Sequence, residues 1–313
     1  RLAAGLYENG IRRGDNIGLY LMNGPEYLES FFGVMKIGAV PFNVNYRYLY
    51  DELEYVFGNA DAKAVIHGAE FSNLVARLKS NLPLLTLSIV VEDGQGDDPA
   101  AANSLAYEDL MTSEPLTEPY DRSEDDYILQ YTGGTTGAPK GAMLSHSNLS
   151  MNAQQVASIN PFDNPQDEVF MGALPMFHVF ANTALLNHAV ATGASIAMVP
   201  RFEVDQVLAT IEKHGATGFP GVPTMFQALL DSPKLAGTTM SSLKVCISGG
   251  APISAPAREN FENATGVRVV EGYGLTESSG VVSVNPYDGV RKSGTIGQVV
   301  PGTQVRLVDK EDA

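Results

Sequence analysis

The stretch NIGLYLMNGPEYLESFFGVMKIG, residues 16–38, decides the fold. Its first seven residues, NIGLYLM, form a short apolar run that is typical of a buried strand. The following PEYLESFFGVMKIG has the apolar periodicity of an amphipathic helix. A strand followed by a covering helix is the unit from which α/β folds are built.

The same unit recurs along the chain. The pairs are AKAVIHG (62–68) with FSNLVARLKSN (71–81), EVFMGALP (168–175) with VFANTALLNHAVATG (179–193), ASIAMVP (194–200) with EVDQVLATIEKHG (203–215), and LKVCISGG (243–250) with SAPARENFENATG (254–266). This alternation predicts layered α/β subdomains with largely parallel sheets covered by helices on both faces. In such folds the loops at the carboxyl ends of the strands bind ligands.

The composition of two segments suggests subdomain boundaries. Residues 92–126 are acidic and contain proline and serine, with one short helix expected at SLAYEDLM (104–111), so we expect a surface connection there. Residues 294–309, GTIGQVVPGTQVRLVD, have the turns and short apolar runs of a small β element. We therefore expect a first αβ subdomain over 1–120, a second αβ subdomain over 121–290, and the start of a β-rich subdomain over 291–313. Both ends of the sequence suggest that it is part of a longer protein.

Charge and cysteine content exclude several classes of function. The 313 residues include 20 Lys and Arg against 36 Asp and Glu, a formal net charge of -16, which opposes binding to nucleic acid. The single cysteine, Cys246, lies in an apolar run and is expected to be a buried structural thiol, so no disulfide framework is expected within the chain. Residues 169–200 lack charged side chains, but polar residues and proline interrupt them too often for a transmembrane span. These features predict a cytoplasmic protein.

A glycine-rich loop lies in YTGGTTGAPKGAMLSH, residues 131–146. It is not the Walker loop of nucleotide-hydrolysing enzymes, because Gly137 is followed by Ala138 and Pro139 before Lys140. Glycines still allow several N–H groups to converge on phosphate oxygens, and the threonine hydroxyls and Lys140 can add donors. The alternative interpretation is a flexible hairpin between the strands YILQY and GAMLS.

A second chemical motif is VVEGYGLTESSG, residues 269–280. There Tyr273 can stack on a base, Thr276 can bind a phosphate, and Glu277 can hold Mg²⁺, which prefers oxygen ligands and pairs with phosphates. The alternative interpretation is a core tyrosine and a solvated turn glutamate.

Together these two motifs resemble the adenylate-forming superfamily, which includes acyl-CoA synthetases, firefly-type luciferases and the adenylation domains of peptide synthetases. The resemblance extends over essentially the whole chain, including LPMFHVFA at 174–181, SGGAPIS at 248–254 and SGTIGQVVPGT at 293–303. Within the superfamily, TGGTTGAPKGAML, EGYGLTE and SVNPYD look most like bacterial long-chain fatty acyl-CoA synthetases.

The resemblance implies a role for each matching residue. Thr276, Glu277, His178 and Lys140 would be catalytic, with Thr276 contacting the α-phosphate and the substrate carboxylate, Glu277 binding Mg²⁺ and His178 orienting the carboxylate. The ATP-binding residues would be Thr132, Gly133, Gly134, Thr135, Thr136, Gly137 and Lys140 around the phosphates, and Gly249, Gly250, Ala251, Glu271, Gly272, Tyr273 and Gly274 around the adenine. Phe219, Val222, Met225 and Phe226 are candidates for the wall of an acyl channel, with plain core as the alternative for each.

The implied reaction is ATP-dependent activation of a medium- or long-chain fatty acid, followed by transfer to coenzyme A. An aryl acid, a carrier-protein acceptor, or a non-catalytic nucleotide- or acyl-binding module are the alternatives. The residues lack the mobile C-terminal domain, whose lysine serves adenylation in the family, so we expect them alone to bind nucleotide weakly and turn over poorly. A homodimer and peripheral membrane contact are compatible with the sequence.

Overall fold

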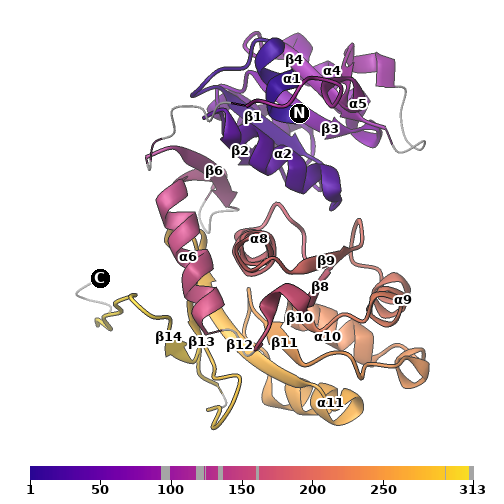
Figure 1. The fold of residues 1–313 in the computed structure, drawn as a ribbon, viewed down its shortest axis with the longest axis vertical. Helices are drawn as coiled ribbons and strands as arrows, with labels where there is room; N and C mark the ends of the chain where they lie inside the picture. The colour runs from indigo at the N-terminus through magenta and orange to yellow at the C-terminus, as the bar shows by residue number, and fades with distance from the viewer. Residues whose placement is uncertain are drawn as a thin grey trace. The chain divides into compact units, whose positions relative to one another are not determined.

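The computed structural model describes residues 1–92, 99–117, 123, 125–132, 137–159, 162–292 and 294–309, and its chain forms two compact units. The first unit comprises Arg1–Asn148 and Pro175–His178, and the second comprises Leu149–Leu174 and Val179–Ala313. Each unit contains one sheet with helices against it, which confirms the predicted α/β class (Figure 1).

The sheet of the first unit has the strand order β5-β4-β3-β1-β2-β6-β7. Its strands are β1 (Asn16–Tyr20), β2 (Val40–Asn43), β3 (Ala64–Gly68), β4 (Leu87–Val91), β5 (Leu105–Ala106), β6 (Tyr127–Thr132) and β7 (Lys140–Ser145). All pairs are parallel except the hairpin of β6 and β7. The helices are α1 (Leu2–Glu8), α2 (Pro25–Lys36), α3 (Tyr50–Asn59), α4 (Ser72–Asn81) and α5 (Tyr107–Leu110), while α6 (His146–Ser158) begins in this unit and continues into the second.

The division between the units lies at residue 148, whereas the sequence placed a boundary at residue 120. The reason is the pairing of β6 with β2 through Phe42 and Leu129, which adds the β6–β7 hairpin to the first sheet. The acidic connection before residue 127 therefore leads back to the same sheet instead of into a new subdomain.

Aromatic packing fills the core between this sheet and the helices α3 and α4. Tyr20 on β1 stacks on Phe71 with ring centroids 3.9 Å apart, and Phe42 on β2 meets Phe57 of α3 edge to face at 5.2 Å. Burying each of these side chains stabilises the unit by roughly 2–3 kcal/mol.

The sheet of the second unit has the order β14-β13-β12-β11-β10-β8-β9. Its strands are β8 (Val169–Gly172), β9 (Ser195–Met198), β10 (Gly218–Gly221), β11 (Val245–Ser248), β12 (Arg268–Leu275), β13 (Gly280–Val284) and β14 (Gln298–Val299). The pairs from β9 to β12 are parallel, and β13 and β14 add antiparallel pairs. The helices are α7 (Val179–Ala181), the π-helix η4 (Asn182–Asn187), α8 (His188–Thr192), α9 (Val204–His214), α10 (Pro223–Leu230) and α11 (Ala255–Thr265).

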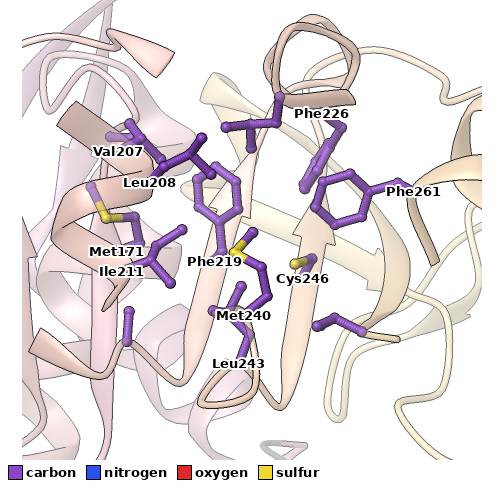
Figure 2. Close-up of a cluster of buried hydrophobic side chains, with 14 of the residues drawn as sticks. Met171, Val207, Leu208, Ile211, Phe219, Phe226, Met240, Leu243, Cys246 and Phe261 are labelled. Carbon is purple, nitrogen blue, oxygen red and sulfur yellow. The ribbon is translucent and has the colours of Figure 1, made fainter. Parts of the chain in front are cut away.

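A large apolar cluster lies between this second sheet and the helices α9, α10 and α11. Figure 2 shows Phe226 beside Phe261, whose ring centroids are 5.1 Å apart, and Phe219 in the same cluster. All three are fully buried, so Phe219 and Phe226 are core residues, the plainer of their two sequence interpretations. Cys246 belongs to the same cluster and burial raises the pKa of its thiol, which confirms the predicted structural role.

Two further predictions concern the small β element at residues 294–309 and the absence of a transmembrane span at residues 169–200. Of the small β element expected over residues 294–309, the structure forms β14 (Gln298–Val299). Residues 303–309 have no regular structure, and Leu307 is exposed. Among the described residues, no helix has the length and apolar character needed to cross a bilayer.

Candidate nucleotide and acid site

The glycine-rich loop joins two paired strands of the first unit. Thr132 ends β6 and Lys140 begins β7, and these two residues are direct partners in the antiparallel register. The hairpin alternative is therefore right about the flanking strands, and phosphate binding by the loop stays a prediction. The predicted phosphate-binding residues Gly133, Gly134, Thr135 and Thr136 lie outside the described residues.

His178 lies in the short segment 175–178 that belongs to the first unit. Its backbone N–H donates to the Pro175 carbonyl at 3.0 Å, which makes a tight turn before the chain enters α7. The surrounding protein withdraws water from the imidazole and lowers the pKa of His178. A neutral imidazole at physiological pH retains one N–H donor, which is the group that the predicted carboxylate contact requires.

The predicted adenine-binding residues of the second unit come from two neighbouring strands. β11 and β12 pair in parallel with Ser248 opposite Glu271, so Gly249 follows one strand next to the place where Gly272 continues the other (Figure 1). The sequence predicted both segments as parts of one pocket, and the strand register brings them together. Tyr273 is 40% exposed, so the core alternative for this ring is wrong.

The turn that carries Thr276 and Glu277 follows β12 directly. Thr276–Ser278 form a short 3₁₀ helix, and the Leu275 N–H donates to Ser278 Oγ at 3.2 Å. β12 then pairs with β13, and a Cβ on Gly274 would lie 1.9 Å from the Gly280 carbonyl oxygen. Only glycine fits there, which explains the Tyr-Gly-Leu-Thr-Glu pattern in steric terms.

Buried polar side chains hold this turn from behind. Thr183 on the π-helix η4 is fully buried and donates from Oγ1 to the Ser279 carbonyl at 2.6 Å. Asn152 on α6 donates from Nδ2 to the Val281 carbonyl at 2.8 Å and accepts from the Val281 N–H at 2.9 Å. Gly280 has φ +124°, and a Cβ there would lie 2.5 Å from Thr183 Oγ1. The turn is thus fixed by close packing and three hydrogen bonds.

Glu271 is held through its backbone, and its side chain is half-buried. Its carbonyl accepts from the Asn285 N–H at 2.8 Å and from Asn285 Nδ2 at 3.3 Å. Burial raises the pKa of the Glu271 carboxyl, an effect that a backbone hydrogen bond to Ile253 and the charge of Arg258 reduce. The position of Glu271 beside the adenine stays a prediction.

The donor set suits magnesium and not a protein-only metal site. Glu277 is exposed, as the solvated-turn interpretation also expected, and the described part of the chain holds no group of three metal-binding side chains. Mg²⁺ keeps several waters and is commonly bound by one or two carboxylates together with substrate phosphates. The single exposed carboxylate of Glu277, next to the hydroxyl of Thr276, fits that pattern.

The four candidates for the acyl channel separate into two groups. Phe219 on β10 and Phe226 on α10 belong to the large core cluster, but Val222 and Met225 belong to a second, smaller apolar cluster. That cluster also contains Leu174, Phe180, Ala181 and Phe202. It lies against the glycines after β11, because a Cβ on Gly249 would be 3.0 Å from the Phe180 ring.

Sequence reasoning missed the side chains that support the site. Thr183 and Asn152 hold the turn after β12, and the buried amide of Asn43 contacts Tyr131 next to the glycine-rich loop. A signal existed for Asn43 and Thr183, which are polar residues within apolar runs, where a side chain must find a hydrogen-bond partner. Asn152 lies among other polar residues and offered no such signal.

Comparison with known proteins places these features in a family. Residues 1–313 match the family described as AMP-binding enzyme. A long-chain-fatty-acid–CoA ligase of Bacillus subtilis is 34% identical over 99% of this chain and 60% of its own length. 4-coumarate–CoA ligase 3 of Arabidopsis thaliana is 32% identical over 99% of this chain and 56% of its own length.

A solved structure agrees with these sequence matches. The crystal structure of the anthranilate CoA ligase AuaEII in complex with anthranoyl-AMP has a TM-score of 0.91 and 28% identity, and covers 99% of this chain and 59% of that one. The chain thus spans about 60% of the length of the relatives it matches.

Proposed function

Because the chain belongs to the AMP-binding enzyme family, we propose that the protein activates a carboxylic acid with ATP and transfers the acyl group to coenzyme A. The acid that we propose is a medium- or long-chain fatty acid. The observation that carries the proposal is the register of β11 and β12, which sets Ser248 opposite Glu271. The segment Gly249–Ala251 follows β11 directly, and Thr276 and Glu277 follow the end of β12.

The first step joins the acid to AMP. A carboxylate oxygen forms a bond to the α-phosphorus, and the bond from that phosphorus to the pyrophosphate oxygen breaks, so pyrophosphate leaves with the electron pair. Both reactants are anions, and repulsion must be offset while attack is held in line. A Mg²⁺ ion bound by Glu277 would neutralise part of the phosphate charge.

The side chains have separate tasks in this step. Thr276 would donate its hydroxyl to the α-phosphate, and Lys140, with the N–H groups of the loop, would hold the β- and γ-phosphates. His178 would donate to the acid carboxylate and so fix its direction of attack. Preorganised donors of this kind contribute about 3–4 kcal/mol each in mutational tests.

The second step releases AMP. The sulfur of coenzyme A attacks the acyl carbon, its thiol proton is lost, and the carbon–oxygen bond to AMP breaks, leaving a thioester. The mixed anhydride of the adenylate is reactive enough for this displacement.

The apolar cluster around Val222 and Met225 supports an apolar acid. It lies next to Gly249, and its members offer no charge to a polar substrate. The name of the Bacillus subtilis relative supports a fatty acid. An aryl acid is the second candidate, because the cluster includes the rings of Phe180 and Phe202 and relatives act on 4-coumarate and anthranilate.

A carboxylate panel tests the proposal on the full-length gene product. ATP–pyrophosphate exchange should be fastest with fatty acids, and AMP release should require coenzyme A. Exchange with aryl acids only would replace the substrate class, and no exchange with any acid would refute the function. Val222→Trp should shorten the preferred acyl chain, while an unchanged preference would remove this residue from the channel.

A further inference from the structure

Three buried amide side chains surround two predicted site segments of the first unit. Asn23, Asn43 and Gln130 are 7%, 8% and 3% exposed. Their partners are the backbone groups of Tyr131, Met176 and Phe177. Tyr131 directly precedes Thr132 at the base of the glycine-rich loop, and Phe177 directly precedes His178. The amides therefore lie between the nucleotide-binding and the acid-binding parts of the unit.

Asn43 contacts both segments with one side chain. Its Oδ1 accepts from the Tyr131 N–H at 2.5 Å, and its Nδ2 donates to the Tyr131 carbonyl at 3.1 Å. The same Nδ2 donates its other hydrogen to the Phe177 carbonyl at 2.7 Å. An amide is the neutral side-chain group that can accept once and donate twice in this way.

The position of Asn43 at the end of β2 explains this geometry. The backbone register between β2 and β6 pairs Phe42 with Leu129, two residues before Tyr131. Beyond that point the Asn43 side chain takes the N–H and the carbonyl of Tyr131, as a neighbouring strand would. The strand pairing is thus extended to the last residues before the loop by a side chain that also reaches the His178 segment.

Gln130 provides a natural comparison. It is equally buried and donates from Nε2 to the same Phe177 carbonyl at 2.7 Å. Gln130 lies on β6 directly before Tyr131, so its side chain also links this strand to the His178 segment, but it leaves the N–H and the carbonyl of Tyr131 to Asn43. Removing the Gln130 amide therefore frees the Phe177 carbonyl and keeps the base of the loop held. On the far side, Asn23 Oδ1 accepts from the Met176 N–H at 2.9 Å.

We infer that Asn43 is a positioning residue that couples the glycine-rich loop to the His178 segment, so that the nucleotide and the acid are oriented by one buried amide. The inference rests on the proposed function for its consequence in catalysis. The coupling itself is a property of the fold. If the coupling exists, removing the Asn43 amide disturbs both segments. Removing the Gln130 amide disturbs the His178 segment.

The test compares Asn43→Ala with Gln130→Leu in the full-length enzyme. Asn43→Ala should raise the KM for ATP and the KM for the acid together, each about tenfold, as expected for the loss of a buried hydrogen bond at each segment. Gln130→Leu should raise mainly the KM for the acid. A rise in one KM only for Asn43→Ala, or equal effects of both variants on ATP, would overturn the inference.

Amide hydrogen exchange tests the coupling without activity. Asn43→Ala should speed exchange in peptides covering residues 127–132 and in those covering 175–178, whereas Gln130→Leu should speed it in the latter. Faster exchange in only one segment of Asn43→Ala would refute the coupling even if the enzyme is active. If Asn43→Ala does not fold, Asn43→Ser is measured by the same two criteria. Absence of activity in the wild type would refute the proposed function but leave this measurement decisive for Asn43.

Discussion

Replacing Thr183 by valine should loosen the turn that carries Thr276 and Glu277. Thr183 Oγ1 donates to the Ser279 carbonyl at 2.6 Å. Both residues are buried, with exposed fractions of 0% for Thr183 and 4% for Ser279. Valine keeps the shape of the side chain but leaves that carbonyl without its donor. The cost of a buried acceptor that loses its partner is about 1–3 kcal/mol, so we expect about 2 kcal/mol of destabilisation.

Thr183→Ser is the matched control. It keeps the hydroxyl and removes one methyl group, which costs about 1 kcal/mol of transfer and cavity energy. The two variants therefore separate the hydrogen bond from the packing. Valine should lower the melting temperature by about 4–8 °C, more than serine does.

The assay combines urea unfolding with ATP–pyrophosphate exchange on the full-length enzyme. Since the Ser279 carbonyl ends the turn after Thr276, the valine variant should also have a lower exchange rate than the serine variant. If Thr183→Val is as stable as wild type, or if Thr183→Ser is the less active of the two, then the hydrogen bond does not hold the turn and the reasoning fails.

Three further predictions follow from individual side chains. His67 is fully buried, and desolvation lowers its pKa from 6.5 to about 4. The free energy of unfolding should therefore be highest above pH 6.5 and fall by about 3 kcal/mol as the pH drops toward 4. Urea unfolding measured across that range should show this dependence on pH, and His67→Gln should reduce it. Cys246 should react with a thiol reagent only after denaturation, because it is fully buried and burial raises its pKa, and rapid labelling of the native protein would contradict this. Arg291→Met should lower the free energy of unfolding by about 2 kcal/mol, because Arg291 forms an ion pair with the half-buried Glu262. Lys234→Met removes an exposed ion pair and should lower it by less than about 1 kcal/mol. Equal losses in chemical denaturation would contradict this difference.

Much of the local structure could be predicted because the strand–helix periodicity is strong. The segment at residues 16–38 forms β1 and α2 as expected, and EVDQVLATIEKHG forms α9 (Val204–His214). The small β element expected over residues 294–309 is reduced to β14, which pairs with β13, because a strand requires a partner and residues 303–309 pair with no described strand. The boundary expected at residue 120 also differs from the structure, because pairing of β6 with β2 is a long-range contact that local composition does not encode.

For the predicted site, too, the sequence identified the local motifs, and their arrangement in space depends on long-range contacts. The motifs identified Gly249–Ala251 and Glu271–Glu277, and the register of β11 with β12 sets Ser248, directly before the first segment, opposite Glu271, the first residue of the second. The meeting of the glycine-rich loop with the Thr276–Glu277 turn around a single nucleotide stays a prediction, since Thr135 lies outside the described residues and the two motifs belong to separate units.

The sequence by itself determined the α/β class, the position of most strands and helices, and the two motifs that carry the chemistry, because periodicity and turn composition are local properties of the chain. Only the tertiary structure decided which polar side chains support those motifs. Asn43 and Thr183 act on backbone groups 88 and 96 residues away, and a buried amide or hydroxyl acquires its partner only when the chain has folded.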